Sequence, residues 1–195
     1  MAFIRRFKRD FPDAVDIRLE ENFRSTGHIL AAANAIIAED KARLGKTLFT
    51  RKGKGTPVEL MSFRDGDAEA AGLADALVAR KGEGARWAEM AVLHKAKGLE
   101  FPHVFLPAFE AGIIPSSYGD VDEERRLAYV ALTRGMRQVR ISWALYRRGL
   151  TEPSPFVDAI PERSRVFLSR PNPKHLSPQA RAGLRHIAGR LRHHG

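Results

Sequence analysis

The stretch HVFLPAF, residues 103–109, is an apolar run in the middle of the chain. Such a run is typical of a strand that is buried on both faces of a parallel sheet. Helical and extended patterns alternate on either side of it, which indicates an α/β fold with an open parallel sheet and helices on both faces. In such folds, ligands gather where the carboxyl ends of strands meet loops. We therefore expect the functional residues to lie in the loops at that edge.

Local signals along the chain predict the other elements. The expected helices cover residues 3–9, residues 27–44, a segment that ends near Lys81, and residues 123–136. Their N-cap candidates are Ser25 or Thr26 for the second helix, Asp65 or Asp67 for the third and Asp122 for the fourth. The expected strands cover residues 15–19, 58–63, 89–94, 103–109 and, as the last strand, 138–145.

Composition limits the kind of protein. The chain has 195 residues, enough for one domain with a substantial core, and 44% of them are hydrophobic. No apolar run approaches the roughly 20 residues of a membrane span, so we expect no membrane partner. The absence of cysteine excludes disulfides and thiolate metal sites and suits a cytoplasmic protein. The histidines show no metal-binding spacing, so we expect no metal site.

The net charge of +10 is unevenly distributed. Residues 163–195 carry eight lysines and arginines and no acidic residue, whereas the remainder has 25 basic and 23 acidic residues. We therefore divide the chain into a nearly neutral domain, residues 1–162, and a basic tail, residues 163–195.

The segment RLGKTLFT, residues 43–50, contains a Gly-Lys-Thr that invites comparison with an ATP-binding P-loop. A P-loop also needs a second glycine, five residues before the glycine that precedes the lysine. Counted back from Gly45, that position is occupied by Asp40. The apolar run 29–37 further predicts a helix before Gly45, where a P-loop would have a strand. The segment therefore does not hold phosphate, and no other Gly-Lys-Ser/Thr occurs in the chain.

Three other segments carry residues suited to a nucleotide. They are ENFRS (21–25), HKAKGLEF (94–101) and TRG (133–135), and each lies at the end of an expected strand or helix. Together they offer an aromatic ring for a base, two arginines for phosphate and a carboxylate for ribose hydroxyls. Each residue also has an ordinary structural reading: Phe23 as a core residue, the arginines as solvated side chains, and Glu100 as the partner of a nearby lysine.

In combination, these segments resemble the second motor domain of the UvrD/Rep/PcrA helicases, ATP-driven 3′–5′ DNA translocases of superfamily one. The resemblance runs over roughly residues 3–161 and rests on the following stretches: LEENFRSTGHILAAANAIIAEDKARLGKTLFT, HKAKGLEFPHVFLPAFEAGIIP, DEERRLAYVALTRGMRQVRIS and PSPFVDAIP. It implies a RecA-like fold and an ATP·Mg²⁺ site shared with a first motor domain. That domain would supply the P-loop and the Mg²⁺ carboxylates, neither of which this sequence contains.

The resemblance also implies roles for individual residues. Arg24 and Arg134 are the expected catalytic arginines that reach the γ-phosphate. Phe23 would stack on adenine, Glu100 would hydrogen-bond the ribose, and Gly98 completes the expected ATP-binding set. His94 and Lys95 would contact single-stranded DNA.

The sequence departs from the family pattern in several places. The family's inserted accessory subdomain is missing, because GARWAEMAVL runs directly into HKAKGLEF. Val92 stands where the family commonly has a DNA-contacting Thr, and Gly135 replaces the usual Ala. These departures leave three readings open: a helicase motor domain, a non-enzymatic DNA-binding or accessory module, and one half of a split helicase.

The basic tail resembles nothing familiar but has its own pattern. Ser177 and Pro178 suit the start of a helix, which Gly183 and Gly189 would weaken. This helix packs on the domain as a solvated basic surface, or Arg181, Arg185 and Arg192 bind DNA phosphates independently of sequence. We expect single-stranded DNA as the partner in the second case. Binding to a membrane surface ranks last, because the apolar stripe of the helix lacks Trp and Phe.

Overall fold

A computed structural model of the chain describes residues 7, 9–15, 17, 19–40, 47–93 and 99–169. The helices in this part are α2 (Gly27–Ala38), α3 (Gly66–Gly82) and α4 (Val121–Thr133), with short 3-10 helices η1 (Trp87–Glu89), η2 (Pro155–Val157) and η3 (Glu162–Ser164). The strands are β1 (Val58–Phe63), β2 (Met90–Val92), β3 (Phe101–Leu106), β4 (Gly135–Ala144) and β5 (Arg165–Ser169).

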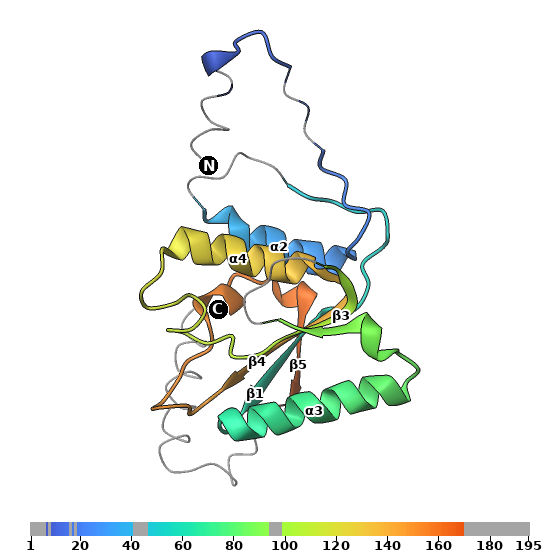
Figure 1. Cartoon of the computed structure of the whole chain (residues 1–195), viewed down its shortest axis with the longest axis vertical. Helices are drawn as coiled ribbons and strands as arrows, with labels where there is room; N and C mark the ends of the chain where they lie inside the picture. Colours follow the sequence, from blue (N-terminus) through green and yellow to red (C-terminus); the bar gives the residue numbers. More distant parts are fainter. Residues whose placement is uncertain are drawn as a thin grey trace.

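The strands of the described residues form one five-stranded sheet in the order β2-β3-β4-β1-β5, and every neighbouring pair is parallel. Helices α2 and α4 lie side by side on one face of this sheet, and α3 lies on the other (Figure 1). The α/β fold with an open parallel sheet, predicted from residues 103–109 and the alternation around them, is therefore confirmed.

The hydrophobic core lies between the sheet and the α2–α4 pair. Alternate residues of β4, namely Val139, Ile141 and Trp143, point to this face. They pack against apolar residues of the neighbouring strands and the two helices, among them Val58, Leu60, Val104, Leu106, Ile29, Ile36, Ala128 and Leu132. Because α2 and α4 each bury an apolar face here, their ends have fixed positions relative to the strand ends.

A network of polar side chains lies on the opposite face of the sheet. The buried Glu59 of β1 accepts hydrogen bonds from Gln138 Nε2 (2.6 Å) and Arg140 Nε (2.8 Å) of β4. Gln138 Oε1 lies 3.0 Å from His103 Nδ1 of β3, and the Arg140 guanidinium lies over the Phe105 ring. This network joins three adjacent strands, and it satisfies both oxygens of a carboxylate that would be costly to bury alone.

At the carboxyl edge of the sheet, Arg147 joins two buried glutamates. Its guanidinium forms an ion pair with Glu69 of α3 and donates to Glu110 Oε1 at 2.5 Å. Glu69 also accepts from Ser142 Oγ (2.6 Å) and the Ala108 N–H (3.0 Å), while Glu110 accepts from the Ala144 N–H. These bonds tie α3 to the loops that follow β3 and β4.

Several strand predictions need correction. Val15, Ile17 and Leu19, within the expected strand 15–19, are exposed and pair with no described strand. Strand β3 ends at Leu106 rather than at residue 109, because Ala108 adopts a left-handed conformation (φ 53°) in which its N–H reaches Glu69. The strand 138–145 is not the last: β5 pairs in parallel with β1, so the segment 165–169, assigned to the tail, belongs to the sheet.

The helix predictions are closer, with differences at the ends. Helix α2 ends at Ala38, before the predicted residue 44, and buried Asp40 pairs with Arg126 of α4 at 2.8 Å. Asp65 caps α3 as predicted, through its bond from the Ala68 N–H. Asp120, rather than Asp122, caps α4, by accepting from the Glu123 N–H. Residues 7, 9 and 10 are helical, and the rest of the expected helix 3–9 lies outside the described residues.

Candidate nucleotide-binding site

The described residues of the three segments singled out in the sequence, 21–25, 99–101 and 133–135, meet at one edge of the sheet. Residues 21–25 lead into α2, Glu100 directly precedes β3, and Arg134 lies between α4 and β4. Both strands begin at this edge, so the segments meet at the amino ends of β3 and β4. For the described residues, the expected convergence is confirmed, but the expected carboxyl edge is wrong.

Backbone hydrogen bonds hold the segments together. The Phe101 N–H donates to the Arg134 carbonyl at 3.0 Å, and the Thr26 N–H donates to the Met136 carbonyl at 3.2 Å. On the other side, the Asn22 N–H donates to the Phe49 carbonyl at 2.7 Å. The position of each segment is therefore set by main-chain contacts, independently of the functional side chains.

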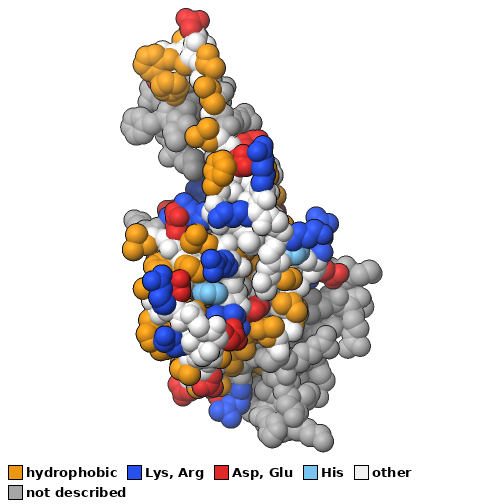
Figure 2. Space-filling view, turned by 90° about the vertical axis from the view of Figure 1, so that its right-hand side faces the viewer, with side chains coloured by type: hydrophobic (Ala, Val, Ile, Leu, Met, Phe, Trp, Pro, Cys, Tyr) orange, Lys and Arg blue, Asp and Glu red, His pale blue; other side chains and the backbone are white. Residues whose placement is uncertain are grey.

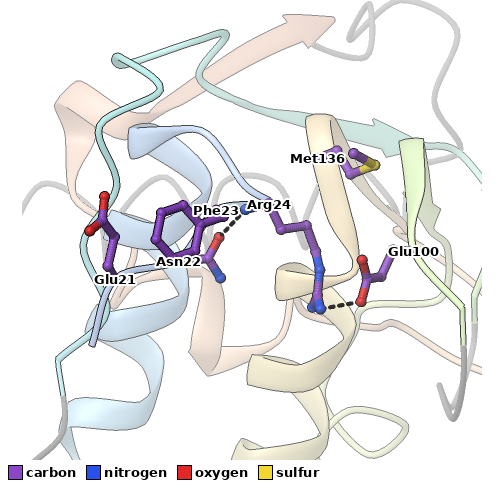
Figure 3. Close-up of a pocket in the computed structure, with 6 residues that line it drawn as sticks. All are labelled: Glu21, Asn22, Phe23, Arg24, Glu100 and Met136. Atoms are coloured by element: carbon purple, nitrogen blue, oxygen red, sulfur yellow. Dashed lines mark hydrogen bonds and ion pairs between the residues drawn. The ribbon is translucent and has the colours of Figure 1, made fainter. Parts of the chain in front are cut away.

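The turn that carries Phe23 and Arg24 is organised by Asn22. Asn22 Oδ1 accepts from the N–H groups of both Arg24 and Ser25, each at 2.8 Å. Such a bond from an Asn side chain to the backbone two and three residues on is typical of a tight turn. As a result, the Phe23 ring and the Arg24 side chain point away from each other (Figure 3). Phe23 is 74% exposed. The alternative interpretation of Phe23 as a core residue is therefore wrong.

Arg24 is directed toward β3. Its guanidinium forms an ion pair with Glu100 through Nη2 and Oε1 (Figure 3), and Nη1 donates to the Thr133 carbonyl at 3.4 Å. Both side chains are about one-third exposed, so the pair lies at the surface of the site. The buried Nε of Arg24 has no hydrogen-bond partner within the described residues.

Arg134 ends α4 as its C-cap residue and is partly buried. Its Nε is buried and, within the described ranges, without a hydrogen-bond partner. No ion pair joins its guanidinium to a described acidic residue. A partly buried guanidinium without an acceptor among the described residues is suited to bind an anion, since charge-assisted hydrogen bonds are the stronger ones.

Glu21, Asn22, Phe23, Arg24, Glu100 and Met136 line an open hollow of about 410 Å³ (Figure 3). This volume falls in the range of small-molecule sites. Lys52 lies beside the hollow, where its Nζ donates to the Arg24 carbonyl at 3.3 Å, and Arg51 pairs with Glu21 at 3.3 Å. Figure 2, which views the molecule from the right-hand side of Figure 1, shows lysines and arginines among hydrophobic side chains.

Sequence reasoning did not single out Asn22, Met136 or Lys52. The Asn before a helix start is a turn signal that would have pointed to Asn22. Nothing local indicates the other two, because their place depends on how β4 and the loop 51–55 pack. The remaining expected site residues lie outside the described residues: His94, Lys95, Gly98, Arg181, Arg185 and Arg192.

The family model described as the UvrD-like helicase C-terminal domain matches residues 17–93 and 88–146 of this chain. The chain belongs to that family. The matched residues include the Asn22–Ser25 turn, Glu100 and Arg134, so the hollow is built from the part of the chain that defines the family. Local packing favours glycine at position 135, because a Cβ there would lie 2.4 Å from Val139 Cγ2 in the core.

Relatives in the family are DNA helicases. The chain is 39% identical over 115 residues to DNA helicase II of Escherichia coli, covering 49% of this chain and 16% of that protein. It is 42% identical over 105 residues to the ATP-dependent DNA helicase UvrD1 of Mycobacterium leprae, covering 52% of this chain and 13% of that one. The chain therefore spans about one sixth or less of the length of these relatives.

A solved structure supports the fold. The crystal structure of the C-terminal domain of a possible DNA helicase from Lactobacillus plantarum matches with a TM-score of 0.51 and 15% identity, covering 76% of this chain and 99% of that one. The resemblance described above implies that the family's accessory subdomain is inserted after the strand that corresponds to β2. In this chain, only residues 93–100 lie between the end of β2 and the start of β3.

Two further findings concern ligands and membranes. Within the described ranges, no group of three or more His, Asp or Glu side chains is arranged to hold a metal ion. None of the described helices is both long enough and apolar enough to cross a bilayer.

Proposed function

We propose that this chain supplies one half of an ATP site, as the second motor domain of a UvrD-like DNA helicase. The observation that carries the proposal is the pair of arginines at the amino edge, each with a buried Nε that lacks a described acceptor, beside an exposed aromatic ring. Family membership and the names of the relatives support a helicase role.

Each side chain then has a defined task. Phe23 stacks on adenine, which its exposed face permits. Arg24 and Arg134 bind the phosphates and stabilise charge on the transferred γ-phosphoryl group, as arginine fingers do. Glu100 accepts hydrogen bonds from the ribose hydroxyls, and Gly98 lies in the segment just before it.

ATP binding must exchange partners within the site. Arg24 now pairs with Glu100, so a phosphate oxygen has to replace the carboxylate at the guanidinium. That exchange frees Glu100 for the ribose. The side chains of Arg24 and Glu100 are each about one-third exposed. Neither has to leave a buried position for Arg24 to bind phosphate and Glu100 to bind the ribose.

The other half of the site belongs to a first motor domain. The P-loop and the carboxylates that hold Mg²⁺ would come from that partner, in the parent protein or on a separate chain. Hydrolysis would drive 3′–5′ movement along single-stranded DNA, which His94 and Lys95 contact, with Arg181, Arg185 and Arg192 as further phosphate contacts.

Binding of a fluorescent ATP analogue to a mixture of this chain and a P-loop-bearing first motor domain tests the proposal. Phe23→Ala should weaken binding by at least about fivefold, because stacking contributes about 1–3 kcal/mol per base. Phe23→Tyr should keep it. Phe49→Ala is the matched control, since Phe49 is exposed near the same turn but does not line the hollow. Equal loss in the Phe23→Ala and Phe49→Ala variants would contradict the assignment.

A further inference from the structure

The side chain of Ser25 connects the segment that carries Arg24 with the segment that carries Arg134. It is fully buried, and its Oγ donates to the Gly135 carbonyl at 2.7 Å, with the Thr133 carbonyl 3.5 Å away. Ser25 follows Arg24 directly, and the two carbonyls belong to the residues on either side of Arg134. A single hydroxyl therefore links the backbone next to one arginine with the backbone next to the other.

Helix capping does not explain this serine. The N-cap residue of α2 is Thr26, and its side chain makes no capping bond. The first N–H groups of the helix donate instead to loop carbonyls, Gly27 to Gly53 and His28 to Lys54, both at 2.8 Å. The usual reason for Ser before a helix, an acceptor for the first N–H groups, is thus met by another segment.

The backbone of Ser25 is held as well as its side chain. Its N–H donates to Asn22 Oδ1 at 2.8 Å, so the turn bearing Phe23 and Arg24 is fixed on one side by Asn22. The hydroxyl fixes the same turn on the other side, to Gly135. Without the hydroxyl, the buried Gly135 carbonyl would lose its 2.7 Å partner, and the turn would lose a contact to the Arg134 segment.

We propose that Ser25 is a positioning residue that sets the spacing of Arg24 and Arg134, so that both guanidinium groups bind one polyphosphate chain. This inference rests on the proposed function of the two arginines. Because Ser25 is buried beneath the turn, it acts through the arginines and does not touch the ligand itself.

The test uses the full chain and sodium tripolyphosphate, followed by NMR through the arginine Nε–H signals and the backbone amides. With Ser25 in place, Arg24→Ala and Arg134→Ala should each lower the affinity for tripolyphosphate about tenfold. The variant with both substitutions should lose little more affinity, because both groups act on one ligand. Ser25→Ala should lower the affinity about tenfold with both arginines present. Adding Arg134→Ala to Ser25→Ala should then change it by less than about threefold.

Ser142→Ala is the matched control. Ser142 is also buried and its hydroxyl donates to Glu69 at 2.6 Å, but at the opposite edge of the sheet. It should leave tripolyphosphate affinity within about twofold while lowering stability, as loss of a buried bond does. If Ser25→Ala does not fold, Ser25→Cys fills the same space with a weak donor and serves in its place.

The outcomes separate the two proposals. Parent-like affinity in Ser25→Ala, or an equal loss in Ser142→Ala, would overturn the positioning role while the arginines keep theirs. If Arg24→Ala and Arg134→Ala leave the affinity unchanged, the phosphate role of the arginines is wrong, and the role of Ser25 falls with it.

Discussion

Arg24 and Glu100 form an ion pair across the amino edge of the sheet, although 75 residues separate them in the sequence. Arg24 precedes α2 and Glu100 precedes β3. The ion pair therefore joins these two segments directly. It also holds the guanidinium on an internal carboxylate. The carboxylate therefore competes with any phosphate for Arg24.

Replacing Glu100 with Gln removes that competitor. We expect Glu100→Gln to raise the affinity of the full chain for tripolyphosphate several-fold, because Arg24 no longer has to give up a charged partner. ATP should gain less than tripolyphosphate, since the ribose exchanges a charged carboxylate acceptor for the weaker, neutral amide oxygen of Gln. Isothermal titration with both ligands measures the difference.

Glu83→Gln is the control for this change, because Glu83 is an exposed residue paired with Arg80 at the end of α3. It should leave both affinities as they are. Weaker tripolyphosphate binding by Glu100→Gln would show that Glu100 does not compete for Arg24.

The carboxyl edge should govern stability instead. Arg147→Met leaves the buried carboxylates of Glu69 and Glu110 without their cation, and breaking such a pair typically costs about 3–5 kcal/mol. These same carboxylates hold the pKa of Arg147 above its usual value, chiefly through the Glu110 hydrogen bond. Urea unfolding should show the loss. Arg86→Met, which removes an exposed pair with Glu89, should have almost no effect, and a comparable loss there would argue against a special role for the edge.

Asp65 should make stability depend on pH at the acid end. The bond from the Ala68 N–H, and then that from Arg64, lower the pKa of this carboxyl below the ordinary 3.8. The cap therefore stabilises fully above pH 3.8 and loses its effect as pH falls through the lower folded value. Asp65→Ala should cost about 1 kcal/mol at pH 7, and the difference from the parent should shrink as pH is lowered through that window.

Asp67→Ala is the matched control, because Asp67 lies in the first turn of α3 without being its cap. Urea unfolding at a series of pH values compares the three chains. A difference between the parent and Asp65→Ala that stayed constant down to pH 2 would contradict the linkage.

Sequence reasoning predicted the fold class, and singled out segments whose described residues lie together, for a physical reason. Burial on both faces makes 103–109 continuously apolar, and polar residues such as Arg24, Glu100 and Arg134 stand out at element ends. The prediction that the site lies at the carboxyl edge of the sheet was wrong because residues 15–19 were expected to form a strand. Such a strand would have put ENFRS at a carboxyl end. Alternation predicts a strand, but not whether a neighbouring strand is there to pair with it.

Long-range partners could not be predicted. Ser25 precedes a helix and therefore suggested a cap, yet the bonds that serve α2 come from Gly53 and Lys54. Similarly, β5 was assigned to the tail because basic residues follow it, whereas its place beside β1 depends on the whole sheet. In both cases the deciding contact is far away in the sequence.

The position of β5 changes how the tail has to be tested. Removal of residues 171–195 spares the sheet and takes away Lys174, Arg181, Arg185, Arg190 and Arg192. If these side chains bind phosphates, affinity for single-stranded DNA should fall, and the slope of log affinity against log salt should flatten by about 0.7 per lost contact. Fluorescence anisotropy over a salt series measures both. An unchanged slope would place the DNA contacts elsewhere, with His94 and Lys95 as the next residues to replace.

ATP hydrolysis by the reassembled pair tests the half-site account most directly. The full chain alone should show no single-stranded-DNA-stimulated ATPase activity. Addition of a first motor domain bearing a P-loop should restore it, and Arg134→Ala or Arg24→Ala should lower the turnover number at least about 10³-fold with the fold intact. Robust hydrolysis by the chain alone, or full activity of the mixture with both arginines replaced, would contradict the account.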